Sequence, residues 1–273
     1  MPKIASIGVV GHSVFLPVPH FHIGGETLEA TDIHFEYGGK GVNQATAAAR
    51  FGADVAFLGA VGMGDAENTR KFTDSENIRA TIIEKPGQTA YAAIVTDPTG
   101  ATHVTVYQGV RLDEADVDAF ADEIRAADIL LLNNEVEEAV NLRALRYAKE
   151  GNTRIILNPA PARETAKELL DGVYLFTPNE FETEFLEDYE NVVVTLGENG
   201  CFLRESGIRV PAVPHGKAVD TTGAGDTFNG VLAVMLAEGR SLAEAARIAN
   251  TACGIEVSRK YAASSIPKRE EVL

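Results

Sequence analysis

The sequence is poor in cysteine and in positive charge. Its only two cysteines, Cys201 and Cys253, are far apart and form no CxxC or Cys/His cluster. This spacing argues against a disulfide framework and against a structural zinc site. We therefore expect a protein of the reducing cytoplasm.

The charge balance excludes two classes of partner. Lys and Arg total 24 against 40 Asp and Glu, so the formal net charge is -16. Such a chain repels a nucleic-acid backbone and an anionic membrane surface. Apolar runs such as 231–237 fall short of the ~20 residues that a membrane span needs. We expect neither nucleic acid nor membrane as a partner.

The remaining pattern predicts one large α/β domain over residues 1–273. No linker, repeat or low-complexity tract divides the chain, and short β-rich runs alternate with helical periods. That alternation indicates a doubly wound, mostly parallel sheet with helices on both faces. The expected strands are Ile4–Val9, Asp54–Val61, Ile129–Asn133, Thr153–Leu157, Gly172–Thr177 and Val192–Leu196. The expected helices are Val42–Phe51, Glu67–Glu76, Glu114–Ala126, Glu137–Glu150, Ala162–Leu170, Thr227–Glu238 and Leu242–Arg259.

Two regions break the alternation. Residues 14–37 contain prolines, histidines and paired glycines ahead of a strand-like run, and residues 89–107 resemble hairpins around the turn 97–100. Together they predict a small β-sheet lid over one edge of the domain. The helix after Ser241 begins with Ser241 and Glu244 at the spacing of a capping box.

The segment 219–228 is the sharpest chemical signal. Gly223, Ala224 and Gly225 allow several backbone amides to converge ahead of a helix, which favours an anion pocket. A carboxylate in the same turn, Asp226, suits a base that removes a proton from a hydroxyl attacking a phosphoryl group. The alternative is a helix cap next to a tight glycine turn.

A second glycine segment also precedes a helix. Gly38 and Gly39 let a ligand lie against bare backbone, while Lys40 and Asn43 offer donors for hydroxyl groups. The alternative is a glycine turn with a solvated lysine. Neither segment is a Walker A loop, and no GxGxxG fingerprint occurs, which argues against an NAD-dependent oxidoreductase.

Taken together, these two segments resemble the ribokinase-like (PfkB) carbohydrate kinases. The resemblance runs almost end to end, and the stretches 157–164, 177–180 and 264–271 resemble ribokinases in particular. It implies a ribokinase-like fold and transfer of the γ-phosphoryl group of ATP to a primary hydroxyl of a small carbohydrate. A ribose-like pentose is the first expectation.

The resemblance also implies roles for individual residues. Asp226 matches the catalytic base, and Gly223, Ala224 and Gly225 match the anion hole. The matches to sugar contacts are Gly38, Gly39, Lys40, Asn43 and Glu135. Asn179 and Glu182 match an NxxE element that organises Mg²⁺ through water. The matches to nucleotide contacts are Thr195, Gly197 and Asn250, and the matches to ligands of an activating K⁺ are Asp220 and Thr222.

Several positions depart from the family pattern. Gly11 and Ser13 stand where ribokinases carry an Asn and an Asp that hold sugar hydroxyls, so ribose loses two anchors. Arg111 brings a positive charge near the sugar side, either for an acidic sugar or as a surface partner of the acidic run 113–118. Tyr261 replaces a glycine of the cation loop; its bulk argues against a left-handed backbone and weakens the expectation of K⁺ activation.

One more departure is a shorter chain behind the nucleotide site. Between 181 and 194 about one helix is missing, so that the NxxE helix runs almost directly into the next strand. With these departures, other readings remain open: a non-catalytic sugar or nucleotide binder, or a kinase for a fructose-type sugar, a sugar acid or a nucleoside. Related ribokinases pair through their lids, which implies a homodimer.

Overall fold

A six-stranded parallel sheet forms the centre of the molecule. The computed structural model describes residues 1–273, and the strand order in this sheet is β10-β9-β8-β1-β4-β5. The bounds are β1 Lys3–Ile7, β4 Asp54–Gly62, β5 Ile78–Lys85, β8 Ile129–Asn133, β9 Arg154–Asn158 and β10 Leu175–Phe176. The inner strands are buried on both faces and mostly apolar, as in β8, whereas the edge strand β5 is only partly buried and carries Arg79 and Glu84.

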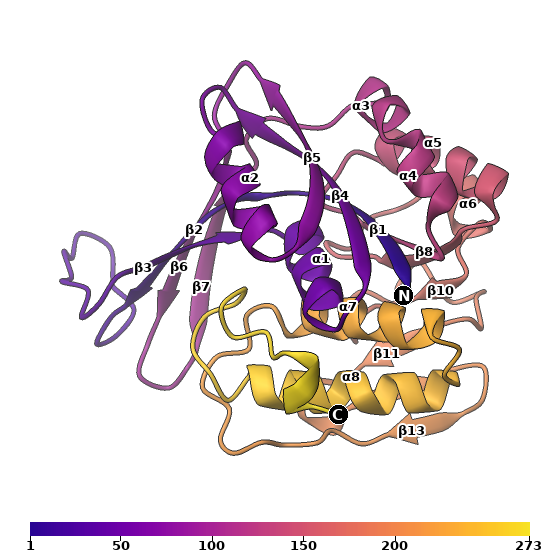
Figure 1. Ribbon diagram of the computed structural model, residues 1–273. Coiled ribbons are helices and arrows are strands. Elements are labelled where there is room, and N and C mark those ends of the chain that lie inside the picture. Colours follow the sequence, from indigo (N-terminus) through magenta and orange to yellow (C-terminus); the bar gives the residue numbers. More distant parts are fainter.

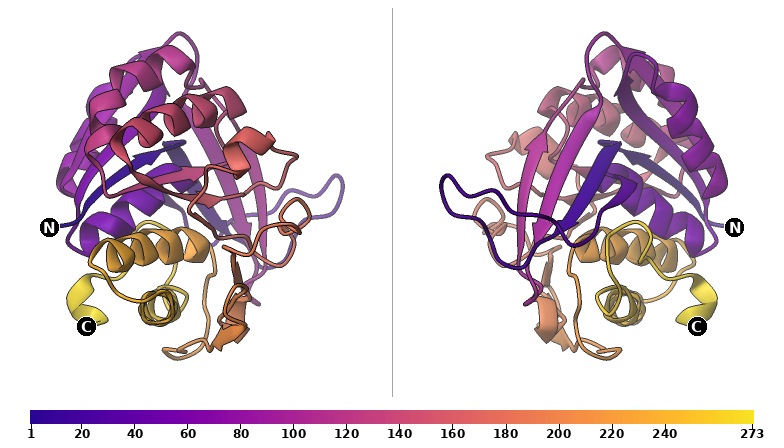
Figure 2. Two further views of the ribbon diagram at one scale, coloured as in Figure 1. Left: turned by 90° about the vertical axis from the view of Figure 1, so that its right-hand side faces the viewer. Right: turned by 90° about the vertical axis from the view of Figure 1, so that its left-hand side faces the viewer.

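Helices cover both faces of this sheet (Figures 1 and 2). One layer contains α1 (Lys40–Arg50), α7 (Ala224–Ala237) and α8 (Leu242–Glu256), and the other contains α3 (Glu114–Ala119), α4 (Ala121–Ala126), α5 (Glu138–Gly151) and α6 (Lys167–Leu170). Alternate strand residues serve the two layers: Ile4 packs with the first and Ala5 with the second. The expected doubly wound class is confirmed. A further helix, α2 (Ala66–Ser75), packs against β5.

The expected lid is also confirmed. A four-stranded sheet in the order β3-β2-β6-β7 projects from the domain (Figure 1). Its strands are β2 Gly11–Pro17, β3 His34–Gly38, β6 Ala90–Thr96 and β7 Thr102–Tyr107. The turn between β6 and β7 is held by Asp97, whose carboxylate accepts hydrogen bonds from the N–H groups of Thr99 and Ala101. We call this four-stranded sheet the lid.

The capping box at the start of α8 forms as the sequence predicts. The hydroxyl of Ser241 accepts a hydrogen bond from Glu244 N–H at 3.3 Å, and the Glu244 carboxylate accepts one from Ser241 N–H at 3.1 Å. No helix of the chain is both long enough and apolar enough to traverse a lipid bilayer.

Several predicted elements differ from the structure. The helix expected over 114–126 is two short helices that meet at Phe120, which is buried at their junction. The helix expected over 162–170 is reduced to α6, and strand β5 was not predicted. The strand expected over 192–196 is only β11 (Val193–Thr195), and it pairs antiparallel with β12 (Cys201–Leu203). A third short strand, β13 (Ile208–Val210), completes that sheet, and two single-turn 3-10 helices lie at Gly197–Asn199 and Arg269–Glu271.

The prediction of a helix at the NxxE element is wrong. Residues 179–191 form a series of turns between β10 and β11, with no helix. The cause is local: the Asn179 side chain accepts the N–H of Phe181 and the Glu182 carboxylate accepts the N–H of Asn179. These bonds close tight turns in place of a helical ladder.

Candidate active site

A cavity of about 230 Å³ lies between the lid and the carboxyl ends of the central strands. Ten of the residues singled out from the sequence line it: Gly11, Ser13, Gly38, Gly39, Lys40, Asn43, Glu135, Thr222, Gly223 and Asp226. These residues come from four separate parts of the chain. The fold therefore brings both glycine segments to one site.

Asp226 sits at the buried end of this cavity. It is only 5% exposed, and its carboxylate accepts hydrogen bonds from Asn43 Nδ2 at 3.1 Å and from Gln44 Nε2 at 3.2 Å. Burial raises its pKa, while the positive charge of Lys40 and these two amides act in the opposite direction. The N-cap of α7 is Gly223, and Asp226 accepts no hydrogen bond from the helix end. The capping alternative for Asp226 is therefore wrong.

The start of α7 provides an anion site beside this carboxylate. Gly223 has φ 93°, a left-handed conformation that glycine adopts without strain. The N–H groups of Gly223 and Gly225 have no hydrogen-bond partner, whereas Ala224 N–H donates to Thr221 at 3.3 Å. Two free amides at the positive end of a 14-residue helix can neutralise charge on a phosphoryl group.

The second glycine segment approaches the first strand closely. Gly39 has φ 109°, and a Cβ atom there would lie 2.5 Å from the carbonyl oxygen of Val9. Glycine is therefore required at this position, and α1 begins directly after it. Lys40 is partly buried, and the negative charge of Asp226, then those of Glu135 and Glu182, raise its pKa. Its charge belongs to the site and not to a solvated face.

Glu135 follows β8 and faces the same cavity. Its carboxylate accepts the N–H of Lys40 at 2.8 Å. Burial raises the pKa of Glu135 to about 7, with the Lys40 charge opposing that shift and the Asp226 charge adding to it. A carboxyl group with this pKa can accept or donate a hydrogen bond to a hydroxyl near neutral pH.

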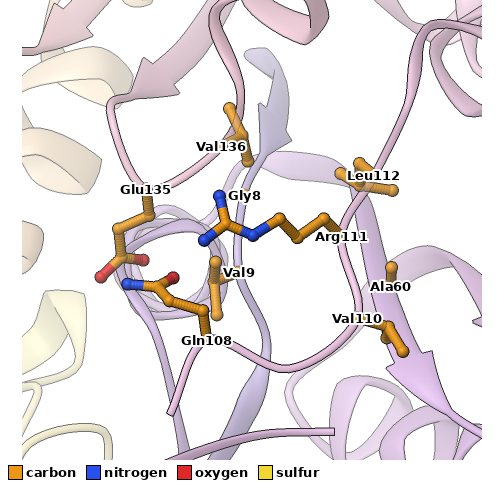
Figure 3. A pocket seen from close by; sticks show the side chains of 9 residues that line it. All are labelled: Gly8, Val9, Ala60, Gln108, Val110, Arg111, Leu112, Glu135 and Val136. Atoms are coloured by element: carbon orange, nitrogen blue, oxygen red, sulfur yellow. The ribbon is translucent and has the colours of Figure 1, made fainter. Parts of the chain in front are cut away.

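Arg111 does not line the main cavity. It lines a neighbouring cavity of about 20 Å³, where Figure 3 shows its guanidinium near Gln108 and Glu135. That space holds about one water molecule. The guanidinium forms an ion pair with Glu137. The predicted pairing of Arg111 with the acidic run 113–118 is therefore wrong.

The residues expected to serve the nucleotide lie outside the cavity lining. Thr195 ends β11, and Gly197 begins the next turn with φ 53°. Asn250, in α8, is buried and donates its side-chain amide to the carbonyls of Val210 and Pro211. This amide holds β13 against α8, and a nucleotide contact at Asn250 stays a prediction.

The segment expected to hold a cation is ordered by Asp220. Its carboxylate accepts the N–H groups of Thr222 at 2.9 Å and of Tyr261 at 3.1 Å. Tyr261 has φ 74°, so it adopts the left-handed conformation that its bulk argued against. Stacking of its ring on His34, with centroids 3.7 Å apart, accompanies that conformation.

Three polar residues of the site were missed from the sequence. Gln44 donates a hydrogen bond to Asp226. Glu36 of the lid accepts one from Ala262 N–H, in a loop beside Gly223, and the Glu256 carboxyl group lies against Gly223. Glu256 is fully buried, and neither of its carboxyl oxygens has a hydrogen-bond partner. The signal was present: Glu256 follows Ala249 and Ala252 on the apolar side of α8, where a charged residue is unusual.

Comparison with known proteins identifies the family of this chain. The model of the pfkB family of carbohydrate kinases matches residues 1–269. This chain belongs to the pfkB carbohydrate kinase family. It is accordingly a carbohydrate kinase, and the kinase resemblance is confirmed.

Relatives of the kinase cover nearly its whole length. It is 35% identical to a ribokinase of Haemophilus influenzae over 293 residues, which cover 98% of this chain and 96% of that one. The solved ribokinase of Thermotoga maritima matches with a TM-score of 0.86 at 32% identity, covering 100% and 98% of the two chains. A ribokinase of Arabidopsis thaliana, solved with ribose and ATP, matches with a TM-score of 0.84 at 25% identity, covering 99% and 97%.

Proposed function

We propose that this kinase transfers the γ-phosphoryl group of ATP to the primary hydroxyl of a ribose-like pentose. The observation that carries the proposal is Asp226, a buried carboxylate held by two side-chain amides directly beside two unpaired backbone N–H groups. A base and an anion site in one turn fit in-line phosphoryl transfer. The sugar-phosphate and ADP are the products.

Asp226 is the base in this reaction. It takes the proton of the primary hydroxyl while the hydroxyl oxygen bonds to the γ-phosphorus and the bond to the ADP oxygen breaks. The N–H groups of Gly223 and Gly225 face the negative charge that develops on the phosphoryl oxygens. Asn43 and Gln44 fix the carboxylate, which keeps its orientation when the substrate binds.

Mg²⁺ is the metal that this chemistry calls for. Asn179 and Glu182 lie in one tight turn, and the Glu182 charge is near enough to Lys40 to raise the pKa of that lysine. Carboxylate oxygens reaching the metal through water suit Mg²⁺, which keeps much of its hydration shell. Bound there, the metal would neutralise phosphate charge.

The segment at Asp220 and Thr222 is also a candidate site for a monovalent cation such as K⁺. The backbone carbonyls of Asp220 and Thr222 are oxygen donors of the kind that cations bind, and Tyr261, whose N–H bonds the Asp220 carboxylate, has the left-handed conformation typical of glycine. We therefore retain Asp220 and Thr222 as the candidate K⁺ ligands.

The choice of a pentose rests on the sugar end of the cavity. Lys40, Asn43 and Glu135 present donors and acceptors to hydroxyl groups, and several similar proteins are ribokinases. The lid side offers the polar groups of His12, Ser13 and Tyr91 among apolar side chains such as Ile94 and Val104, but no carboxylate. We therefore expect weaker binding of ribose than in an enzyme with an acidic anchor, which keeps a fructose-type sugar, a sugar acid and a nucleoside as alternatives.

The test is ADP release from Mg-ATP across a panel of pentoses, hexoses, sugar acids and nucleosides. Asp226→Asn keeps the size of the side chain and one of its two acceptor oxygens but removes the base, so we expect turnover to fall at least about 10²-fold. Turnover that depends on one sugar class and is lost in the variant supports the proposal. Folded protein that binds ATP but turns over no panel member would support the non-catalytic binder.

We also propose a homodimer formed through the lid. The outer strands β3 and β7 have open edges, and Phe35, Val106 and Tyr107 of these strands are each more than half exposed. Apolar groups on open strand edges favour pairing with a second copy. The two thiols are unpaired, and the cytoplasm remains the expected location.

A further inference from the structure

Glu36 of lid strand β3 is bonded to a loop of the main domain. Its Oε1 accepts the N–H groups of Ala262 at 2.9 Å and Ala263 at 3.0 Å, and its Oε2 accepts that of Ser264 at 3.1 Å. The Glu36 side chain is 8% exposed. Hydrogen bonds to a charged acceptor are about twice as strong as neutral ones, and burial strengthens them further.

The loop that Glu36 holds borders the phosphoryl-transfer turn. Tyr261 N–H donates to the Asp220 carboxylate, whose other oxygen accepts Thr222 N–H one residue before Gly223. A Cβ atom placed on Gly223 would lie 3.2 Å from the Cβ of Ala262. The position of loop 261–264 therefore defines one wall of the turn that carries the anion hole.

Aromatic residues of the lid also pack against loop 261–264. The Tyr261 ring stacks on His34 at 3.7 Å and meets Phe15 edge-on at 5.2 Å, so strands β3 and β2 both contact it. On its other side the loop is anchored to α1, because Arg50 donates to the carbonyls of Ala263 and Ile266. The loop cannot follow a displaced lid freely, so lid movement must break the Glu36 bonds or distort the loop.

Glu36 lies far enough from the joint between the lid and α1 for a small rotation of the lid to break its hydrogen bonds. Glu36 lies three residues from Gly39, the left-handed glycine at which the lid strand joins α1. At ~3.3 Å per residue, the Glu36 backbone is roughly 10 Å from that joint. A modest rotation of β3 about Gly39 therefore moves the carboxylate beyond hydrogen-bond distance of the loop.

We propose that Glu36 is a positioning residue that couples the sugar-binding lid to the phosphoryl-transfer turn through loop 261–264. The lid position that encloses the sugar is the one in which Glu36 bonds the loop, so sugar binding and nucleotide binding stabilise each other. This coupling rests on the proposed function, since it needs both ligands. The structural link from Glu36 to the turn does not.

The first experiment needs no sugar. Hydrogen exchange is measured in the ligand-free protein for residues 260–265 and 220–227, comparing the parent with Glu36→Gln and Glu36→Ala. We expect Glu36→Ala to speed exchange in both segments by at least about tenfold, with a smaller change in Glu36→Gln, which keeps one acceptor oxygen. Glu29→Ala is the matched control, because Glu29 is an exposed carboxylate in the loop between lid strands β2 and β3 and its side chain forms no hydrogen bond.

The second experiment measures the coupling itself. Calorimetry gives the affinity for a non-hydrolysable ATP analogue with and without the sugar identified in the panel. We expect the sugar to strengthen nucleotide binding about fivefold or more in the parent and in Glu29→Ala, and less than about twofold in Glu36→Ala. A purely structural role for Glu36 would lower stability but leave this ratio unchanged.

The outcomes separate the two proposals. Unchanged exchange of residues 220–227 in both Glu36 variants would overturn the link from lid to turn, whatever sugar the enzyme uses. Altered exchange with no sugar turned over would overturn the proposed function and leave the link supported. Full coupling retained in folded Glu36→Ala would overturn the role of Glu36.

Discussion

Glu135 is the residue whose ionisation bears most directly on sugar binding. Burial raises its pKa to about 7, so its charge changes near neutral pH. The ionised form accepts hydrogen bonds from sugar hydroxyls through both oxygens, whereas the protonated form has lost part of that capacity. Sugar affinity should therefore depend on pH around neutrality.

We expect the dissociation constant of the sugar to rise as pH falls from 8 to 6, by up to about tenfold per pH unit below 7. Calorimetry without ATP measures this. In Glu135→Gln the pH dependence should flatten, and affinity at pH 8 should be weaker by about tenfold, because a charged hydrogen bond is lost. An equally steep pH dependence in Glu135→Gln would assign the titration to another group.

The two glycines that bracket α7 offer a matched pair of substitutions. Gly223 and Gly239 have similar backbone conformations, with φ 93° and 84°. A Cβ atom on Gly223 would lie 2.9 Å from Glu256 Oε1, whereas a Cβ atom on Gly239 meets nothing within 4 Å. Both alanine variants place a Cβ atom on a left-handed backbone, which costs free energy. Only Gly223→Ala also brings that Cβ atom against another residue of the site.

We expect Gly239→Ala to lose about 1 kcal/mol of unfolding free energy with unchanged kcat/KM. Gly223→Ala should lose at least about 2 kcal/mol, and its kcat/KM should fall at least about tenfold because the anion-hole amide is displaced. Urea unfolding and steady-state kinetics measure the two effects. Equal kinetics for the two variants would show that the Gly223 amide is not part of the phosphoryl site.

At the scale of elements, α8 carries a buried carboxyl group whose ionisation opposes folding. Burial raises the pKa of Glu256 well above its usual value, and the charges of Asp226 and Asp220 add to that shift. The folded state therefore binds this proton more tightly than the unfolded state. Stability must then fall as pH rises above the unfolded pKa of about 4.5.

Glu256→Gln tests this directly. A neutral amide resembles the protonated acid, so we expect the two proteins to have similar unfolding free energies near pH 4.5. As pH rises, the parent should lose stability relative to Glu256→Gln by up to about 1.4 kcal/mol per unit. Urea unfolding from pH 5 to 8 gives the difference, and a constant difference would mean that folding does not raise the pKa of Glu256.

At the scale of the whole molecule, the proposed dimer depends on the lid. The lid projects from the domain (Figure 1), and its outer strands β3 and β7 carry exposed apolar residues. We expect sedimentation at micromolar concentration to show a dimer. Phe35→Asp, on the exposed face of β3, should shift the protein to a monomer, because a buried unpaired carboxylate disfavours the interface. A monomeric parent protein would contradict lid pairing.

The sequence alone was enough to predict the α/β class and the lid, and to single out the two glycine segments and Asp226 as the candidate base. Those predictions depend on local periodicity and on residue types that few other structures require, such as glycine at 39 and 223. The resemblance to ribokinases also predicts that ribose lacks two anchors, at Gly11 and Ser13 of lid strand β2.

The interactions between groups that are distant in the sequence follow from the tertiary structure alone. The pairing of Arg111 with Glu137, the burial of Glu256 beneath Gly223 and the bonds from Glu36 to loop 261–264 join residues that are up to 228 positions apart. The short strands β11 to β13 and the turns at 179–191 were likewise not predicted, since brief segments take their conformation from their neighbours. Local pattern identifies the reacting groups, whereas packing sets their pKa values and their coupling.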